Sequence, residues 1–347
     1  MPQARQFLPV PADAFSLPGF VSAHSHAFQR ALRGGGAGGD FWAWRDSMLA
    51  EAARQTPETV RSGYERTYGE MRAAGYTAVG EFHYLGPDEA QAAVDAAAAT
   101  GIELALLLVA HERGGLERFR QSSVADYLGQ VERLRATGAR IGLAPHSVRA
   151  CSAAWLTEIG RYAERERLAL HVHADEQPRE IDECLAEHGV RPIELLSRTG
   201  CLTARTTVVH ATHASPKELD LMADAGAAVC LCPTTEANLG DGFPPVEALL
   251  ERDIRLAIGS DSNVRIDPLE ELRELEGTAR RQLGRREVIP VDRLLAIGST
   301  EGAATLGIDT WPGVEVDTAH PALEGVADED IPGALVFSCG ADVLRPA

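Results

Sequence analysis

The sequence predicts an α/β fold in which eight parallel strands, each followed by a helical connection, close into a (β/α)8, TIM-like barrel. Eight short apolar runs alternate with longer segments of helical periodicity, which is the pattern of parallel strands joined by helices. Histidines and acidic residues follow these runs, at the end where such barrels gather their functional groups. The first run is not followed by GxGxxG, so a doubly wound dinucleotide-binding sheet is disfavoured.

The eight apolar runs give the strands in chain order. Helices are predicted between them, among others over 57–74, 152–167, 178–198 and 268–283, and three of these four begin with proline, which suits a first helical turn. After the barrel, the chain is rich in Pro, Gly, Val and Asp, with short strand-like pieces such as 333–338, and we expect a small accessory layer there. The predicted strands are 20–26, 76–84, 102–110, 140–147, 168–174, 206–212, 227–233 and 255–262.

Composition limits the class of partner. The chain of 347 residues is long enough to bury one large core. Its 51 acidic residues outnumber 33 Lys and Arg, and the formal net charge of -18 disfavours nucleic acid and anionic membranes. The six scattered cysteines predict reduced, buried thiols. Without a signal-peptide pattern or an apolar run long enough to span a bilayer, the protein is expected to be cytoplasmic.

Two histidine pairs stand at predicted strand ends. His24 and His26 end the first strand two residues apart, so their side chains point to the same side and can chelate one cation. His171 and His173 repeat this spacing in the fifth strand. His173 is the outer residue of that pair, whereas His171, deeper in the strand, is better explained as a core histidine. Each pair alone is weak evidence for a metal.

The joint placement of further residues strengthens the metal interpretation. His210 ends the sixth strand and Asp261 ends the eighth, although a lone Asp there could also cap the next helix. Chance would have to place four histidines and this aspartate at one face of the barrel. Imidazole and carboxylate ligands suit Zn²⁺, and Fe²⁺ and Mn²⁺ accept the same ligand types. Cys230 and Cys232, which end the seventh strand, are interpreted as small buried hydrophobes.

These residues resemble the signature of the amidohydrolase superfamily, and the resemblance extends over nearly the whole predicted barrel. The fourth strand ends in Pro145-His146-Ser147 and not in the lysine of the binuclear members, which is similar to the mononuclear deaminase branch. More local stretches closely resemble the formimidoylglutamate deiminases, a family of bacterial histidine degradation. These stretches are 24–30, 41–45, 75–84, 146–150 and 235–242.

The resemblance implies a mechanism and a substrate. It implies hydrolytic deimination of N-formimidoyl-L-glutamate, with release of ammonia, by a homodimer with one Zn²⁺ per subunit. The metal ligands would be His24, His26, His173 and Asp261, with Glu176, His210 and Asp261 as the catalytic residues. A substrate with two carboxylates needs guanidinium groups in a protein that repels anions overall. The implied substrate-binding residues are Gln29, Arg45, Tyr84, His146 and Arg149.

The chain departs from this family at its ends, where a small β-sandwich is usual. Residues 1–17 and 308–347 are therefore expected to be short terminal segments, the remnant of such a sandwich, outside a metal-dependent amidohydrolase barrel over 18–307. Apolar surface left by the reduced layer would have to be accommodated by a partner subunit or by disorder. The loop 85–87 is also shorter, and Asn263 stands where a histidine is common, so substrate affinity is expected to differ.

Two other functions stay open. A deaminase of the same superfamily acting on a purine, a pyrimidine or a related ring amidine would share the metal site, but it would leave Arg45 and Arg149 unpaired. A non-catalytic relative would fit the shortened ends, but not the presence of every expected catalytic residue. Without the resemblance, the two arginines are more simply solvated surface residues, and Trp42 and Trp44 are core anchors.

Overall fold

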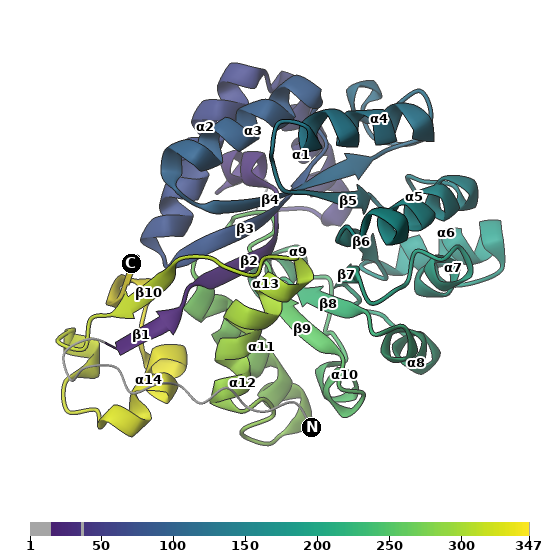
Figure 1. Ribbon diagram of the computed structural model, residues 1–347. Coiled ribbons are helices and arrows are strands. Elements are labelled where there is room, and N and C mark those ends of the chain that lie inside the picture. The colour runs from purple at the N-terminus through teal and green to yellow at the C-terminus, as the bar shows by residue number, and fades with distance from the viewer. Residues whose placement is uncertain (1–14, 36–37, 347) are drawn as a thin grey trace.

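The computed structural model describes residues 15–35 and 38–346, and its main body is an eight-stranded parallel barrel surrounded by helices (Figure 1). The strands pair in the order in which they occur along the chain. The predicted fold class is confirmed, and all eight strands lie where the apolar runs place them. They are β2 (Phe20–Ser25), β3 (Tyr76–His83), β4 (Glu103–Ala110), β5 (Ile141–Pro145), β6 (Leu170–Ala174), β7 (Thr206–His210), β8 (Ala228–Leu231) and β9 (Arg255–Ile258).

The barrel closes between its first and last strands just beyond the end of β9. Ser25 and Asp261 form a parallel bridge there. The His26 amide donates to the carbonyl oxygen of Asp261 at 2.8 Å, and the Asp261 amide donates to the carbonyl oxygen of His24 at 3.0 Å. The bonds that close the barrel therefore also bring an aspartate beside two histidines.

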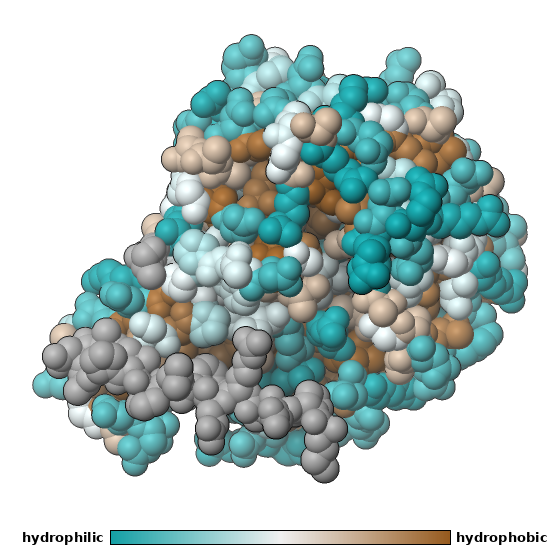
Figure 2. Space-filling view, in the orientation of Figure 1, coloured by the Kyte–Doolittle hydropathy of each residue, from teal (hydrophilic) through white to brown (hydrophobic). Residues whose placement is uncertain are grey.

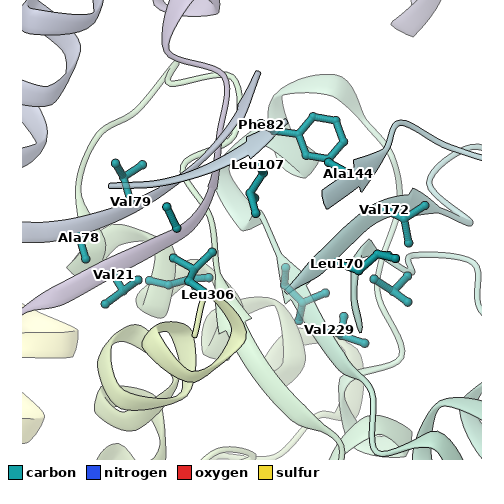
Figure 3. Packing of buried hydrophobic residues seen from close by; sticks show 14 of the residues in the cluster. Val21, Ala78, Val79, Phe82, Leu107, Ala144, Leu170, Val172, Val229 and Leu306 are labelled. Atoms are coloured by element: carbon teal, nitrogen blue, oxygen red, sulfur yellow. The ribbon is translucent and has the colours of Figure 1, made fainter. Parts of the chain in front are cut away.

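The barrel core is filled from both ends of the chain. Figure 3 shows Val21, Leu107, Val172, Val229 and Leu306 packed in one cluster of buried apolar side chains. A β-carbon on Gly80 would lie 2.5 Å from Leu306 Cδ2, so a glycine in β3 makes room for this leucine, whose burial contributes about 1.5–3 kcal/mol. All six cysteines are free and buried, as predicted.

Helices cover the barrel, and most of them begin with a recognisable start signal. Thr56, for example, caps α2 and precedes Pro57. The helix predicted over 178–198 is two helices, because Gly189, with φ 68°, ends the first and Pro192 starts the second. The helices are α1 (Phe41–Arg54), α2 (Pro57–Ala73), α3 (Pro87–Thr100), α4 (Val124–Arg135), α5 (Ala153–Glu166), α6 (Pro178–His188), α7 (Pro192–Arg198), α8 (Pro216–Ala225), α9 (Pro233–Leu239), α10 (Val246–Glu251), α11 (Pro268–Leu283), α12 (Val291–Ala296) and α13 (Gly302–Thr305).

The accessory layer is a three-stranded antiparallel sheet that joins the two ends of the described chain. Its strands, in the order β1 (Phe15–Pro18), β10 (Gly313–Val316) and β11 (Leu344–Pro346), lie beside the barrel (Figure 1). The division into terminal segments 1–17 and 308–347 and a barrel over 18–307 stays a prediction, and residues 1–14 fall outside the described part.

The prediction of a strand-like piece over 333–338 is wrong, because this segment belongs to the helix α14 (Ile331–Ser338). Leu335 and Val336 are buried, and α14 packs on α11 and α12. Arg273 of α11 donates to the Val336 carbonyl at 2.8 Å and also to the Cys339 carbonyl, which satisfies the end of the helix. Tertiary packing therefore overrides the β-propensity of Leu-Val-Phe.

The outside of the molecule is mainly polar on the face drawn in Figure 2, with apolar residues visible chiefly in recesses between hydrophilic ones. Within the described residues, none of the helices combines the length and the apolar character that crossing a bilayer requires.

Candidate active site

Backbone strain is concentrated at the carboxyl ends of the barrel strands. Among the residues that the structure describes, eight non-glycine residues have positive φ, and five of them stand at or just after the ends of β6, β7 and β9. Two of them are His210, with φ 72°, and Asp261, with φ 42°. Such conformations cost on the order of 1–3 kcal/mol each and gather where function requires them. This end of the barrel is therefore the candidate site.

Three imidazoles meet at the centre of this end. The Nε2 atom of His24 lies 3.1 Å from Nε2 of His26 and 3.1 Å from Nε2 of His173. Nδ1 of His26 donates to the Phe82 carbonyl, and Nδ1 of His173 donates to the His146 carbonyl, each at 3.1 Å. A carbonyl oxygen only accepts, so these rings carry their protons on Nδ1 and leave the Nε2 lone pairs free for a cation.

The spacing and protonation of the triad fit a metal ion. Tetrahedral zinc with Zn–N bonds of about 2.0–2.1 Å brings its nitrogen ligands about 3.3 Å apart, close to the observed 3.1 Å. Burial lowers the pKa of His26 to about 3 and lowers the pKa values of His24 and His173 well below their ordinary value. All three rings are therefore neutral, as metal ligands must be.

Asp261 joins the triad to a fourth histidine. Its Oδ1 lies 3.4 Å from His26 Nε2 and 3.7 Å from His24 Nε2, while its Oδ2 lies 3.7 Å from His210 Nε2. Burial raises the pKa of Asp261 to about 7, against the opposing effect of His210. The structure thus places Asp261 beside a buried, histidine-rich metal site: His24, His26 and His173 form one group that could hold a metal ion, and His210, Cys232 and Asp261 form a second. That Asp261 is the fourth ligand of the triad stays a prediction.

Carboxylates surround His210. Its Nδ1 donates to Glu236 Oε1 at 3.1 Å, and its Nε2 lies 3.7 Å from Glu176 Oε1. Burial by itself would lower the pKa of His210, but Glu176, Glu236 and Asp261 overcome this effect and hold the pKa well above its ordinary value. The predicted catalytic residues therefore lie in one connected group beside the triad.

The sequence analysis gave Glu236, within the stretch 235–242, no task of its own and missed its contact with His210. Glu236 also accepts the Cys232 amide at 2.8 Å, one helical turn earlier, at the start of α9. A carboxylate one turn after a strand end is the signal that could have found it. Cys232 lies within 4.8 Å of His210 and Asp261 ligand atoms. Burial raises the pKa of this thiol and disfavours the thiolate that a metal would need. This favours the prediction that Cys232 is not a ligand.

A cavity of about 480 Å³ opens above the metal site. One face of α1 forms part of its wall, because Phe41, Trp44, Arg45 and Met48 recur at helical spacing. All five predicted substrate-binding residues line the cavity, together with Glu176, His210 and Asp261. The lining is His26, Gln29, Phe41, Trp44, Arg45, Met48, Tyr84, His146, Arg149, His173, Glu176, His210, Leu239 and Asp261.

The two arginines of the cavity are held from outside it. Arg149 Nε lies 3.5 Å from Oε1 of the buried Glu180, whose other oxygen accepts the Glu176 amide at 3.2 Å. Sequence reasoning missed Glu180, which stands one helical turn after Glu176. Arg45 lies over the Trp42 ring at 5.9 Å. Burial, and then the like charge of Arg149, lower the pKa of Arg45, so an anion bound between them would be favoured.

Polar groups complete the wall. Gln29, in the turn η1 (Ala27–Leu32), donates from Nε2 to the Tyr84 hydroxyl at 3.2 Å, and Tyr84 in turn donates to Met48 Sδ at 3.4 Å. The Gln29 Oε1 atom is buried and finds no hydrogen-bond partner among the described residues. The part that each of these residues takes in binding stays a prediction.

The chain belongs to the amidohydrolase family, whose model matches residues 15–313. With its buried, histidine-rich metal site, it is an amidohydrolase, a hydrolase of C–N bonds. Among curated proteins, it is 39% identical over 313 residues to a formimidoylglutamate deiminase of Pseudomonas aeruginosa, covering 82% of this chain and 69% of that one. It is 27% identical to a 5-methylthioadenosine/S-adenosylhomocysteine deaminase of Haloarcula marismortui, covering 92% of this chain and 74% of the relative.

Solved structures share the fold over nearly the whole chain. An amidohydrolase from Brucella melitensis superposes with a TM-score of 0.85 and 31% identity, covering 95% of this chain and 84% of that chain. An adenosine deaminase from Xanthomonas campestris, solved with bound zinc, has a TM-score of 0.86 at 24% identity, covering 96% of this chain and 80% of that chain. This structural relative thus binds zinc.

Proposed function

We propose that this protein hydrolyses the amidine of N-formimidoyl-L-glutamate to give N-formyl-L-glutamate and ammonia, with Zn²⁺ as the resident metal. The observation that carries the proposal is that two arginines, Arg45 and Arg149, share one cavity with the metal site. An amidine with two carboxylates matches that combination of charges. The 39% identity to a formimidoylglutamate deiminase supports it. The homodimer expected from the resemblance stays a prediction.

The residues around the metal site have separable tasks. A divalent cation held by the triad and Asp261 would lower the pKa of water in the site and supply a nucleophile at neutral pH. Asp261 stands between the triad and His210, where its carboxylate can accept a proton from the attacking water. Glu176 reaches into the same cavity and can pass a proton to the departing nitrogen. Water and the amidine thereby become N-formyl-L-glutamate and ammonia.

The experiment that tests the proposal is an ammonia assay with zinc-loaded protein. N-formimidoyl-L-glutamate is compared with 5′-methylthioadenosine, guanine and N-formimidoylglycine, which keeps the amidine but has one carboxylate. We expect ammonia from N-formimidoyl-L-glutamate and at least tenfold lower kcat/KM for the glycine derivative, because it leaves one guanidinium unpaired. Turnover of a purine alone would overturn the proposal.

A ring deaminase is the second candidate, since the Haloarcula marismortui deaminase is 27% identical to this chain over 92% of its length. A neutral ring would bring no negative charge to Arg45 and Arg149, of which only Arg149 has a carboxylate beside it, that of Glu180. The glutamate derivative is therefore the better match.

A further inference from the structure

A side pocket adjoins the cavity above the metal site. It has a volume of about 420 Å³, and Arg45, Met48, Tyr84, His146 and Arg149 line both spaces. The main cavity contains the carboxylates of Glu176 and Asp261. By contrast, no acidic side chain lines the side pocket in the part of the chain that the structure describes. In a protein with a net charge of -18, this is a locally cationic compartment.

His111 stands in the wall of the side pocket, just after β4, and the function proposed above gives it no task. Its side chain is 5% exposed, and its ring lies 4.6 Å from the His146 ring. Gly115, with φ 57°, faces it. A β-carbon on Gly115 would lie 3.4 Å from His111 Cε1 and 2.8 Å from the Phe119 ring, so this glycine keeps the space beside the imidazole open.

Hydrogen bonding defines which nitrogen of His111 is free. Nδ1 lies 3.3 Å from the carbonyl oxygen of Arg113, so Nδ1 carries the proton and donates to it. Nε2 is then an unprotonated acceptor, and it is buried without a hydrogen-bond partner among residues 15–35 and 38–346. A buried lone pair of this kind is costly unless a ligand or a proton satisfies it.

The charges that face His111 explain why it stays neutral in the free protein. They are Arg45 from α1, Arg149 from the segment after β5, and Arg120 from its own loop, with the neutral rings of His146 and Tyr84 beside it. Arg113 is paired with Glu187 of α6 at 2.8 Å. Burial, and then the three arginines, lower the pKa of His111 to about 4. A bound carboxylate would oppose the effect of the arginines, because its negative charge compensates theirs and favours the protonated ring.

We propose that the side pocket receives the distal carboxylate of the substrate and that His111 selects for it, by taking one proton from solvent onto Nε2 as that carboxylate binds. The imidazolium then donates from Nδ1 to the Arg113 carbonyl oxygen and from Nε2 to the carboxylate, so both ring nitrogens are satisfied. This inference rests on the dicarboxylate substrate class of the proposed function. It makes His111 a specificity residue, separated from the predicted metal ligand His173 by the His146 ring.

The test is isothermal titration calorimetry on zinc-loaded, full-length protein at pH 7, without turnover. The ligands are N-formyl-L-glutamate and N-formyl-L-glutamine, which differ only in the distal group. Each is titrated in buffers of different ionisation enthalpy, which reports proton uptake. We expect uptake approaching one proton for the glutamate derivative and none for the glutamine derivative.

Three variants assign the proton. His111→Gln keeps a neutral N–H donor near the position of Nε2, so binding should persist without proton uptake. His111→Asn keeps a donor near Nδ1, but its side chain is too short to reach the pocket. It should weaken the binding of N-formyl-L-glutamate about tenfold and change the affinity for N-formyl-L-glutamine less than about twofold. His320→Asn removes a histidine from the segment between β10 and α14 and should behave as the wild type.

The outcomes separate this inference from the proposed function. Binding of N-formyl-L-glutamate without proton uptake, equal uptake in His111→Asn, or no binding at all would overturn the role of His111. Proton uptake through His111 in a protein that releases no ammonia from N-formimidoyl-L-glutamate would instead retain the carboxylate subsite and reject the proposed reaction.

Discussion

Glu176 is the side chain whose function can be separated most cleanly from metal binding. It lies 3.7 Å from His210 Nε2 and belongs to neither group of candidate ligands around the metal site. Glu176→Gln should therefore retain zinc, while kcat falls by about 10²–10⁴, because an amide cannot transfer the proton. Steady-state kinetics and metal analysis on the same preparation check this. Parallel loss of zinc and activity would make Glu176 a ligand.

Glu236 acts on the reaction through His210. Replacing it with Gln keeps a hydrogen-bond acceptor for His210 Nδ1 but removes one of the carboxylates that raise the pKa of His210. The limb of the pH profile of kcat/KM that reports His210 should therefore move to lower pH. Glu274→Gln, on α11, is the matched control, because Glu274 pairs with Arg281 and does not contact His210. A uniformly lower profile with unmoved limbs would indicate a structural role only.

The sequence predicts the position of the strand-end histidines better than it predicts the side chains that contact them, for a physical reason. A candidate ligand at a strand end is visible from local alternation, as at His24 and His26. The contact between His210 and Glu236 depends on how β7 and α9 are placed side by side, and local patterns do not encode that distance. His111 was missed because it follows an apolar strand without a second histidine nearby.

At the scale of elements, α1 determines the shape of the cavity, although it is peripheral to the barrel. Its first turn is held by Asp40, whose side chain accepts the Ala43 amide at 3.0 Å. Trp42 packs under the Arg179 guanidinium of α6 at 4.4 Å. Long, periodic elements such as α11 were predicted to the residue. By contrast, α14 was not predicted, because its packing on the barrel helices decides its structure. The break between α6 and α7 was not predicted either, because it depends on Gly189 and Pro192.

Removing the cap of α1 should loosen the cavity without unfolding the barrel. Asp40→Ala costs about 1 kcal/mol of helix stability, and we expect a several-fold rise in KM with faster amide exchange over 41–54. Ser123→Ala removes an equivalent cap from α4, where Ser123 accepts the Asp126 amide at 3.1 Å, but leaves the cavity intact. Hydrogen exchange and kinetics compare the two. An equal change of KM in both variants would deny α1 this role.

At the scale of the whole molecule, a barrel that places histidines inside becomes sensitive to acid. His171 lies below the triad, with Nε2 3.1 Å from the Thr305 carbonyl, and sequence reasoning assigned it to the core. Burial lowers its pKa from the ordinary 6.5 to about 4. Between these two pKa values, His171 is therefore protonated in the unfolded chain and neutral in the folded chain. The stability associated with the neutral ring is complete above pH 6.5 and is lost as the pH falls toward 4.

The contribution of one such histidine is measurable as a slope. As the pH falls from 6.5 to 4, each histidine that stays buried and neutral makes the free energy of unfolding fall by about 1.4 kcal/mol per pH unit. His171→Gln keeps a donor for Thr305 and should reduce the slope by about that amount, whatever its effect at pH 7. Denaturant unfolding of metal-free protein at several pH values measures it, with His320→Asn as the peripheral control. An unchanged slope in His171→Gln would mean that the folded barrel accommodates the charged ring, and that burial at this position does not exclude a proton.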